Sequence, residues 1–447
     1  MQYDHDTIVA PATASGGALA VIRLAGRDAV AIADRLFRGH RPLAACAGHT
    51  AHFGTIEAEG RVIDEVVATL FLAPKSYTGE DTVEFSCHGS SFIVSEVLRL
   101  AVAAGARMAE PGEFTQRAYL SGRLDLAQAE AVADLITSSS KSAHRIATHQ
   151  LRGGYSSALD RLREELLALT ALLELELDFG EEDVEFADRN QLRDTMQRIG
   201  SELRRLRDSF ELGNALKEGV PVAIVGAPNV GKSTLLNQLL QEDRAMVSDI
   251  AGTTRDVIEE QLTIDGIRFR ILDTAGLRTT TDRLEQMGIE RTHQSIERAR
   301  IILWMVDAST LDQTPERPFT LGEEQLLICV ANKIDTATTT TLPPHFIPLS
   351  ARSGEGLEQL KEAMRKAVPT IDEEQTIVTS ARHHEALESG LEALNRALEG
   401  LQSGLPTDLL SEDIRAVIAA IGSITARGVI LPSEVLAHIF GRFCIGK

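Results

Sequence analysis

The sequence predicts a chain of the α/β and α classes, in which a mixed, doubly wound sheet domain is inserted into a helical domain and a small α+β domain comes first. Three observations predict this. Apolar runs of strand length at 221–225, 268–273 and 325–330 alternate with helical stretches, as in a parallel sheet covered by helices. Leucines recur at spacings of three and four between residues 159 and 173, the pattern of a packed helix. Shorter β-rich runs fill the first part of the chain.

The α+β domain is expected to span residues 1–118. Within it, 18–23, 66–71 and 82–85 have the composition of strands, and 92–104 has that of a helix. Short β-rich runs that alternate with helical ones indicate a small α+β domain.

The helical domain is expected in two pieces, 119–217 and 372–447. Proline and strand signals are nearly absent from the first piece, and helical sequence resumes at Thr379. The sheet domain, 218–371, interrupts them. The simplest arrangement is therefore an insertion, with the two helical pieces packed together. The leucines between 159 and 173 are interpreted as core rather than as a binding surface.

The sheet domain carries a phosphate-binding pattern, Gly226-Ala-Pro-Asn-Val-Gly-Lys-Ser-Thr234. A strand precedes it and a helix follows, which is the context that a P-loop requires. Gly226 and Gly231 have no Cβ, so backbone N–H groups can close around phosphate oxygens, and the next helix adds its positive end. We expect Lys232 to reach the β- and γ-phosphates and the Ser233 hydroxyl to ligate Mg²⁺.

A second pattern indicates which nucleotide base is bound. Asn332-Lys-Ile-Asp335 follows the apolar run 325–330. The carboxylate of Asp335 can accept two N–H bonds from guanine, whereas adenine has no N1–H and would leave that charge unpaired. Discrimination of this kind can reach roughly 10⁴. The backbone of Ser350-Ala-Arg352 would close over the guanine oxygen. The predicted ligand is GTP rather than ATP.

Between these motifs, Asp273-Thr-Ala-Gly276 ends a strand. Asp273 can hold Mg²⁺ through water, Gly276 can donate its N–H to the γ-phosphate, and Thr254 is a candidate second protein ligand of Mg²⁺. The full set of predicted GTP contacts is Asn229, Val230, Gly231, Lys232, Ser233, Thr234, Ser248, Asp249, Ile250, Ala251, Gly252, Thr253, Thr254, Asp273, Thr274, Ala275, Gly276, Asn332, Lys333, Asp335, Ser350, Ala351 and Arg352.

Hydrolysis cannot follow the Ras-like scheme, because Leu277 stands where Ras-like GTPases have the glutamine that orients the attacking water. Nearby candidates for that task are Arg278, Asp282, Glu285 and Glu290. Oxygens of the P-loop and of the polar stretch 248–256 could also surround a monovalent cation that stabilises transition-state charge. Its predicted ligands are Asn229, Ser248, Ile250 and Thr253. Arg255 acting as an arginine finger in cis is the competing hypothesis.

Further motifs accompany the nucleotide pattern. They are Tyr77-Thr-Gly-Glu-Asp81, Cys87-His-Gly89, Pro111-Gly-Glu-Phe-Thr115, Leu124-Asp-Leu-Ala-Gln-Ala-Glu-Ala131 and the terminal Phe443-Cys-Ile-Gly-Lys447. In this combination the chain resembles the MnmE (TrmE) family of tRNA-modification GTPases, within the TrmE-Era-EngA-like translation-factor GTPases. The resemblance runs from Asp6 to the last residue.

The resemblance implies a potassium-stimulated GTP hydrolase (EC 3.6) in which Glu285 orients the water through an intermediary. It implies a homodimer that forms a heterotetramer with an MnmG-type FAD-containing protein. Together they would modify C5 of the wobble uridine, position 34, of certain tRNAs to a carboxymethylaminomethyl- or aminomethyl-type group, using a one-carbon unit of tetrahydrofolate.

The resemblance also implies that the first domain holds a folate at the homodimer interface. The ligand would be 5,10-methylenetetrahydrofolate, or 5-formyl-tetrahydrofolate as its analogue. Motif matching places Arg23, Glu80, Arg123 and Lys447 near it; a pterin edge suits a carboxylate, and glutamate carboxylates suit Arg or Lys. Cys444 is expected near the same pocket. Its catalytic role is a hypothesis beside the alternative of a small buried hydrophobe.

Composition bears on the cellular compartment, on membrane insertion and on nucleic-acid binding. Four cysteines without paired or metal-like spacing indicate a reducing compartment. The longest mostly apolar window, 7–22, is too short to span a bilayer, so a cytoplasmic protein without a membrane partner is expected. The net charge of −20 is unusual for a nucleic-acid binder, so any contact with tRNA requires a local basic patch.

The chain departs from the family pattern at two informative places. Arg123 stands where lysine is common, and the two are not interchangeable at a specific contact. Thr425-Ala-Arg-Gly428 lacks the expected Thr-Gly. Two other classes stay open: a ribosome- or RNA-assembly GTPase, which would need a KH-like module or a second G domain, and a non-catalytic GTP-dependent scaffold.

Overall fold

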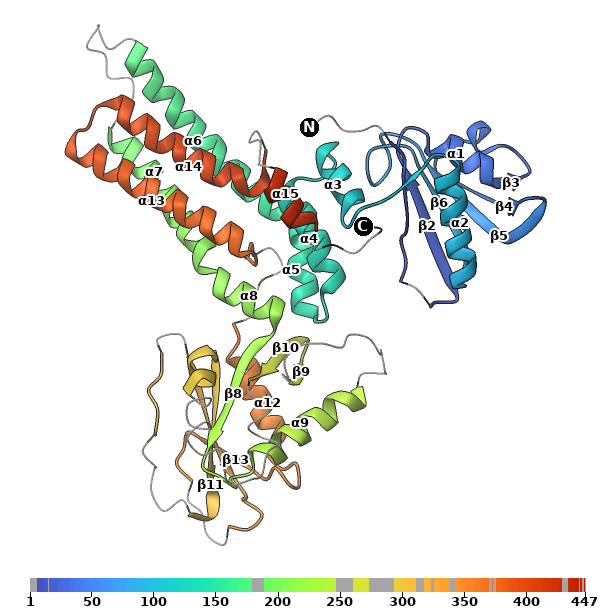
Figure 1. Cartoon of the computed structure of the whole chain (residues 1–447). Coiled ribbons are helices and arrows are strands. Elements are labelled where there is room, and N and C mark those ends of the chain that lie inside the picture. The colour runs from blue at the N-terminus through green and yellow to red at the C-terminus, as the bar shows by residue number, and fades with distance from the viewer. Residues whose placement is uncertain are drawn as a thin grey trace. The chain divides into compact units, whose positions relative to one another are not determined.

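The computed structural model describes residues 6–14, 16–178, 189–246, 260–272, 293–310, 317–322, 325–337, 342–369, 372, 375–427, 433–441, 443 and 446 (Figure 1). By its contacts the chain divides into two compact units. The first unit comprises Met1–Thr137, Ala147–Arg204 and Glu385–Lys447, and the second unit comprises Ser138–Ile146 and Arg205–His384. No helix in the described ranges is both long and apolar enough to cross a membrane.

The first unit begins with a seven-stranded sheet of order β3-β4-β5-β6-β2-β1-β7. Its strands are β1 (Ile8–Pro11), β2 (Leu19–Ala25), β3 (Phe37–Gly39), β4 (Thr50–Ala58), β5 (Arg61–Phe71), β6 (Thr82–His88) and β7 (Arg107–Met108). Only β1 and β7 are parallel neighbours. The predicted strands match β2, β5 and β6, whereas β1, β3, β4 and β7 were not predicted.

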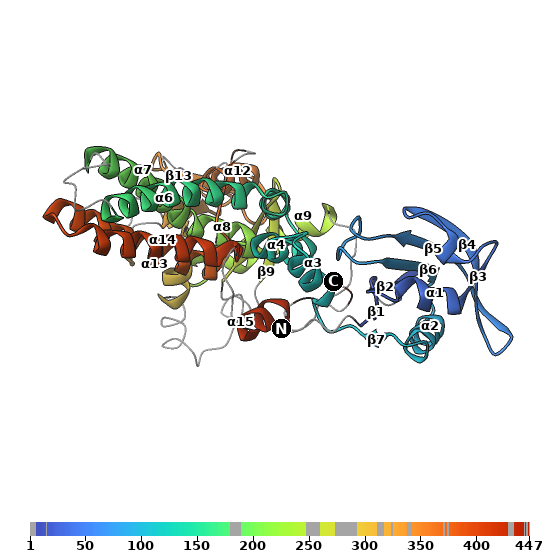
Figure 2. The ribbon, with the colours of Figure 1, turned by 90° about the horizontal axis from the view of Figure 1, so that it is seen from above.

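One face of this sheet is covered by two helices, α1 (Ala29–Leu36) and α2 (Ser91–Ala103), which lie on the same side in Figure 2. Side chains alternate along each strand, so Ile22, Val66 and Phe85 are buried on the covered face. Their neighbours Val21 and Val67 lie on the other, open face. The predicted helix at 92–104 agrees with α2 to within one residue.

The rest of the first unit is helical. Its elements are α3 (Glu113–Leu120), α4 (Leu126–Thr137), α6 (Gly154–Asp178), α14 (Thr407–Thr425), α15 (Ser433–Phe440) and most of α7 (Arg189–Asp208) and α13 (Ala381–Ser403). The end of α7, the start of α13 and part of α5 (Lys141–Leu151) belong to the second unit. The five leucines that recur at spacings of three and four are buried, which confirms their interpretation as core; they are Leu159, Leu162, Leu166, Leu169 and Leu173. Helices from both sides of the predicted insertion therefore share one unit.

A cap fixes the start of α4. The Asp125 carboxylate accepts a hydrogen bond from the Gln128 N–H, and the Gln128 amide oxygen accepts one from the Asp125 N–H, both at 2.9 Å. This is a reciprocal capping box. Arg427, after α14, donates to Asp125 at 3.0 Å and also pairs with Asp160 of α6. Part of the family-specific block at 124–131 thus has a structural role.

The second unit is built on a six-stranded sheet of order β13-β12-β11-β8-β10-β9. Its elements are α8 (Phe210–Glu218), β8 (Val220–Gly226), α9 (Lys232–Met246), β9 (Glu260–Ile264), β10 (Ile267–Ile271), β11 (Ile301–Asp307), η3 (Ala308–Thr310), β12 (Leu326–Asn332), β13 (Phe346–Leu349) and α12 (Leu357–Lys366). All neighbouring strands are parallel except β9 and β10.

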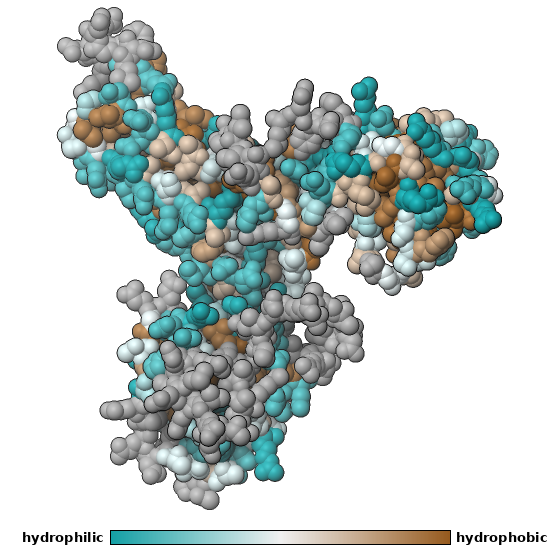
Figure 3. Space-filling view, viewed as in Figure 1, coloured by the Kyte–Doolittle hydropathy of each residue, from teal (hydrophilic) through white to brown (hydrophobic). Residues whose placement is uncertain are grey.

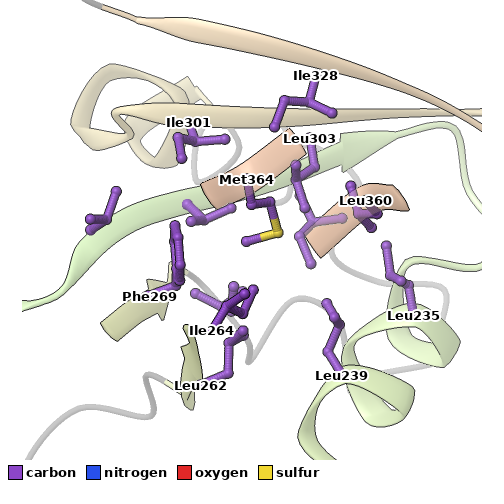
Figure 4. Packing of buried hydrophobic residues seen from close by; sticks show 14 of the residues in the cluster. Leu235, Leu239, Leu262, Ile264, Phe269, Ile301, Leu303, Ile328, Leu360 and Met364 are labelled. Atoms are coloured by element: carbon purple, nitrogen blue, oxygen red, sulfur yellow. The ribbon is translucent and has the colours of Figure 1, made fainter. Parts of the chain in front are cut away.

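Both faces of this sheet are buried. Along β8, Val222 and Ile224 enter one hydrophobic cluster, and Ala223 and Val225 enter another on the opposite face. Figure 4 shows the first cluster, where leucines of α9 and Met364 of α12 meet side chains of the strands. A parallel sheet covered on both faces has continuous apolar strands, which is why the sequence pattern predicted it. The mixed, doubly wound sheet is confirmed.

Candidate functional site

The loop between β8 and α9 has the backbone that a phosphate-binding loop needs. Asn229 and Gly231 adopt φ values of 61° and 104°, in the left-handed region. A Cβ on Gly231 would lie 2.3 Å from Nδ2 of Asn332, so only glycine fits there. Val230 is buried and Asn229 is exposed. Ser233 and Thr234 occupy the first turn of α9, where backbone N–H groups and the helix dipole favour anions.

Lys232 folds back over this loop. Its Nζ donates to the carbonyl oxygens of Gly226 and Ala227, at 2.8 and 3.0 Å. Burial lowers the pKa of Lys232, because desolvation disfavours the charged amine. The amine is therefore held at the loop, the position predicted for contact with the phosphates.

Asn332, at the end of β12, joins three of the predicted motifs. Its side chain is 2% exposed. Nδ2 donates to the Val230 carbonyl at 2.7 Å, and Oδ1 accepts from the Ala351 N–H at 2.8 Å. Both groups of one buried amide are satisfied, and they tie the P-loop to the segment Ser350–Arg352. Ser350 and Ala351 are also buried, whereas Arg352 is exposed.

Lys333 adopts a left-handed backbone with φ of 67°. Its Nζ lies 2.7 Å from Oδ2 of Asp307, the last residue of β11. Burial alone would raise the pKa of Asp307, but hydrogen bonds from Lys333 and Ser309 outweigh it and lower that pKa. The sequence reasoning missed Asp307; the available signal was an acid at the end of an apolar strand.

These residues share one edge of the sheet. β8, β11, β12 and β13 are parallel, so their carboxyl ends lie together. The P-loop follows β8, Asp307 ends β11, Asn332 ends β12 and Ser350 follows β13. Exposed Asp335 comes three residues after Asn332. Ligands of open α/β sheets bind outside this edge.

The remaining predicted nucleotide and hydrolysis residues lie outside the described residues. They are Ser248, Asp249, Ile250, Ala251, Gly252, Thr253, Thr254, Arg255, Asp273, Thr274, Ala275, Gly276 and Glu285. Their roles stay predictions. Among the described side chains, no group of three His, Cys, Asp or Glu could by itself hold a metal ion.

Three of the predicted folate residues are described in the first unit, and they lie at two places. Arg23 of β2 pairs with Glu84 at 2.7 Å, and its guanidinium carbon lies 5.5 Å from the ring centroids of both Tyr77 and Phe114. It also donates to the Gly446 carbonyl at 3.3 Å, so the tail reaches Arg23. Cys444 and Lys447 lie outside the described residues.

Glu80 and Arg123 lie on neighbouring segments. The Ser121 hydroxyl donates to the Thr78 carbonyl at 2.7 Å, which joins the Glu80 loop to the turn that carries exposed Arg123. The Glu80 carboxylate contacts Arg117. Nothing in the sequence reasoning singled out Arg117, although it lies two residues after the motif 111–115.

A P-loop and a guanine-type N-K-x-D motif, joined by one buried amide at the carboxyl edge of a doubly wound sheet, define a P-loop GTPase. The family model described as the MnmE helical domain matches residues 126–444, and the one described as the GTP-binding protein TrmE N-terminus matches residues 7–123. The chain belongs to the MnmE (TrmE) family, as its motifs predicted.

Similar proteins agree along the whole length. The chain is 48% identical to the tRNA modification GTPase MnmE of Bacteroides thetaiotaomicron, over 99% of this chain and 100% of that protein. It is 48% identical to the protein of the same name from Cytophaga hutchinsonii, over 99% and 98%. Among solved structures, a variant of Era from Aquifex aeolicus bound to GDP.AlF4⁻ aligns at 29% identity with 38% of this chain and 65% of its own, with a TM-score of 0.24.

Proposed function

We propose that this chain is a GTP hydrolase that takes part in tRNA modification. The observation that carries the proposal is the Asn332 amide, which holds the P-loop and the segment Ser350–Arg352 in one guanine-type pocket. Full-length relatives named tRNA modification GTPases support the biological role. The G domain is assigned to 218–371, inserted between helical pieces 119–217 and 372–447, after a domain at 1–118.

Within this pocket each residue has a chemical task. Lys232 and the first-turn N–H groups of α9 bind phosphate oxygens, and Asp335 accepts the two N–H bonds of guanine. The Ser233 hydroxyl, at the helix start, fits a Mg²⁺ ligand together with Thr254. Bound Mg²⁺ would supply charge neutralisation at the β- and γ-phosphates.

Potassium stimulates hydrolysis in this proposal. Exposed Asn229, held with positive φ at the rim of the loop, contributes an amide oxygen beside Ser248, Ile250 and Thr253, and Glu285 orients the water. The test is GTP turnover in KCl against NaCl at equal ionic strength. We expect a rise specific to potassium that Asn229→Ala abolishes. Equal rates in both salts would contradict the cation and favour Arg255 as a finger in cis.

The first domain holds a tetrahydrofolate one-carbon donor and dimerises. On the open face of its sheet, Leu19 of β2, the strand that also carries Arg23, and Phe53 of β4 are each 67% exposed; Figure 3 shows hydrophobic residues at the surface of this domain. A second copy of the chain would cover this face. Phe53→Asp should shift the mass measured by light scattering from dimer to monomer, whereas Val62→Asp, at the exposed end of β5, serves as control. An unchanged dimer in Phe53→Asp would contradict this assignment.

The dimer acts with an MnmG-type FAD-containing protein on C5 of the wobble uridine of certain tRNAs. Cys444 comes two residues before Gly446 and Lys447 comes directly after it. The Gly446 carbonyl accepts a hydrogen bond from Arg23, which supports placing both residues at the folate. The test is formation of the modified uridine by the two purified proteins with GTP, tRNA and 5,10-methylenetetrahydrofolate. Product without this chain would remove it from the reaction.

A further inference from the structure

Arg117 of α3 is the centre of a cluster of five charged side chains in the first unit. Its side chain is 3% exposed. Its guanidinium lies 2.7 Å from Asp6, 3.0 Å from Glu113 and 3.2 Å from Glu80. A second arginine, Arg107 of β7, contacts Asp6 and Glu113 at 2.7 Å each.

Glu80 differs from the other two carboxylates in this cluster. Asp6 and Glu113 each contact both arginines, whereas the ion pair found for Glu80 is to Arg117. One nitrogen of Arg117 approaches both Glu80 oxygens, at 3.2 and 3.4 Å. These are long hydrogen bonds, and a carboxylate has about four acceptor positions. Since the Glu80 side chain is 28% exposed, it keeps acceptor capacity that faces outward.

The loop that carries Glu80 is held by its own bonds. The Glu80 carbonyl accepts from the hydroxyls of Ser76 and Thr82, and its N–H donates to the Thr78 hydroxyl. The backbone position is therefore fixed without Arg117. What Arg117 adds is the direction of the side chain and a buried positive charge behind it.

We propose that Arg117 is a positioning residue that aims the Glu80 carboxylate outward at the N–H donors of a pterin. The inference rests on the proposed folate function and goes beyond it by assigning a residue that does not touch the ligand. Two N–H donors on one edge of a pterin match a carboxylate with two free acceptor positions. Being buried, Arg117 acts through Glu80. Asp6 and Glu113, shared with Arg107, hold Arg117 itself in place.

The experiment measures equilibrium binding of 5-formyl-tetrahydrofolate to the full chain in a double-mutant cycle. Glu80→Gln should weaken binding roughly 10- to 100-fold, and Arg117→Gln about tenfold, since hydrogen bonds to charged groups have this range of effect. In the Glu80→Gln background, Arg117→Gln should cause no further loss. Arg117→Lys, which keeps the charge, should restore part of the affinity. Arg99→Gln is the control and should leave binding unchanged, because this exposed arginine of the same domain pairs with Glu96, outside the cluster.

Each outcome decides the question. Equal losses from Arg117→Gln in both backgrounds would overturn the inference, because the residue would then act on stability rather than through Glu80. Tight binding by a folded Arg117→Gln protein, with binding lost in Glu80→Gln, would overturn the inference and leave the folate proposal standing. Absence of binding by the unaltered chain would overturn both. If Arg117→Gln does not fold, Arg117→Lys is measured in both backgrounds, and equal effects would again overturn the inference.

Discussion

The two candidate sites are organised by opposite physical means. In the second unit, a neutral buried amide, Asn332, joins backbone groups of two loops. In the first unit, a buried cation, Arg117 of α3, joins carboxylates of its own helix and of two loops. The neutral arrangement follows from a parallel sheet, which brings strand ends to one edge. The charged arrangement depends on which long side chains happen to meet. The comparison teaches that backbone-built sites follow from motifs, whereas ion-pair networks require the folded structure.

The largest expected effect concerns the neutral centre. Asn332→Ala leaves the Val230 carbonyl and the Ala351 N–H without their partner. A buried unsatisfied group costs about 1–3 kcal/mol, so we expect GDP and GTP affinity to fall roughly 100-fold. Fluorescent-nucleotide titration measures this. Thr336→Ala, which removes an exposed hydroxyl from the same turn, is the control. Unchanged affinity in Asn332→Ala would mean that the two loops hold their positions independently.

The second prediction concerns how much the Arg117 cluster stabilises the first unit at acidic pH. Burial alone would raise the pKa values of Asp6 and Glu113, but hydrogen bonds from Arg107 and Arg117 outweigh it and lower both. For carboxyls with lowered pKa, the stabilisation is present above their ordinary values of 3.8 and 4.5 and is lost as pH falls through the lowered ones. We therefore expect the free energy of unfolding of the first unit to fall as the pH drops below these ordinary values.

Thermal unfolding from neutral pH to about pH 3 measures that loss. Glu113→Gln has one carboxyl fewer to protonate, so its unfolding temperature should fall less steeply with acid than that of the unaltered chain. If the unfolding temperatures of Glu113→Gln and of the unaltered chain fell equally with decreasing pH, the cluster would not govern stability in acid.

The smallest expected effect concerns left-handed backbone positions, which are occupied by different residue types in the two units. The P-loop places glycine at a left-handed position, whereas the C-cap of α14 places Ala426 there, with φ of 53° and ψ of 25°. This explains why a glycine was expected after Thr425. Ala426→Gly should stabilise the first unit by about 0.5–1 kcal/mol, seen as a higher unfolding temperature. Ala419→Gly, at an exposed position inside the same helix, should instead destabilise it by about 1 kcal/mol.

Sequence reasoning reached the parts that local patterns encode. The apolar strands of the second unit, the glycine loop and Asn332 were predicted because each has a periodicity or a motif with a direct backbone meaning. Arg117 was missed because its partners Asp6 and Glu80 lie 111 and 37 residues away. Asp307 was missed because its partner Lys333 was assigned only to the nucleotide. Strand β4 was missed because Thr50, His52 and Gly54 leave its covered face without an apolar alternation, while the apolar Phe53 lies on the open face.

The pairing of Asp125 with Arg427 has a consequence for how the chain folds in time. The two residues are 302 positions apart, and the interval contains the whole inserted sheet domain. At about 5–20 residues per second, synthesis of that interval takes roughly 15–60 s. During this time α6 has no α14 to cover its leucines. The first helical half therefore keeps apolar surface exposed during this time, while the second unit can complete its own sheet. Newly made chains thus pass through a stage in which chaperones can bind that exposed surface.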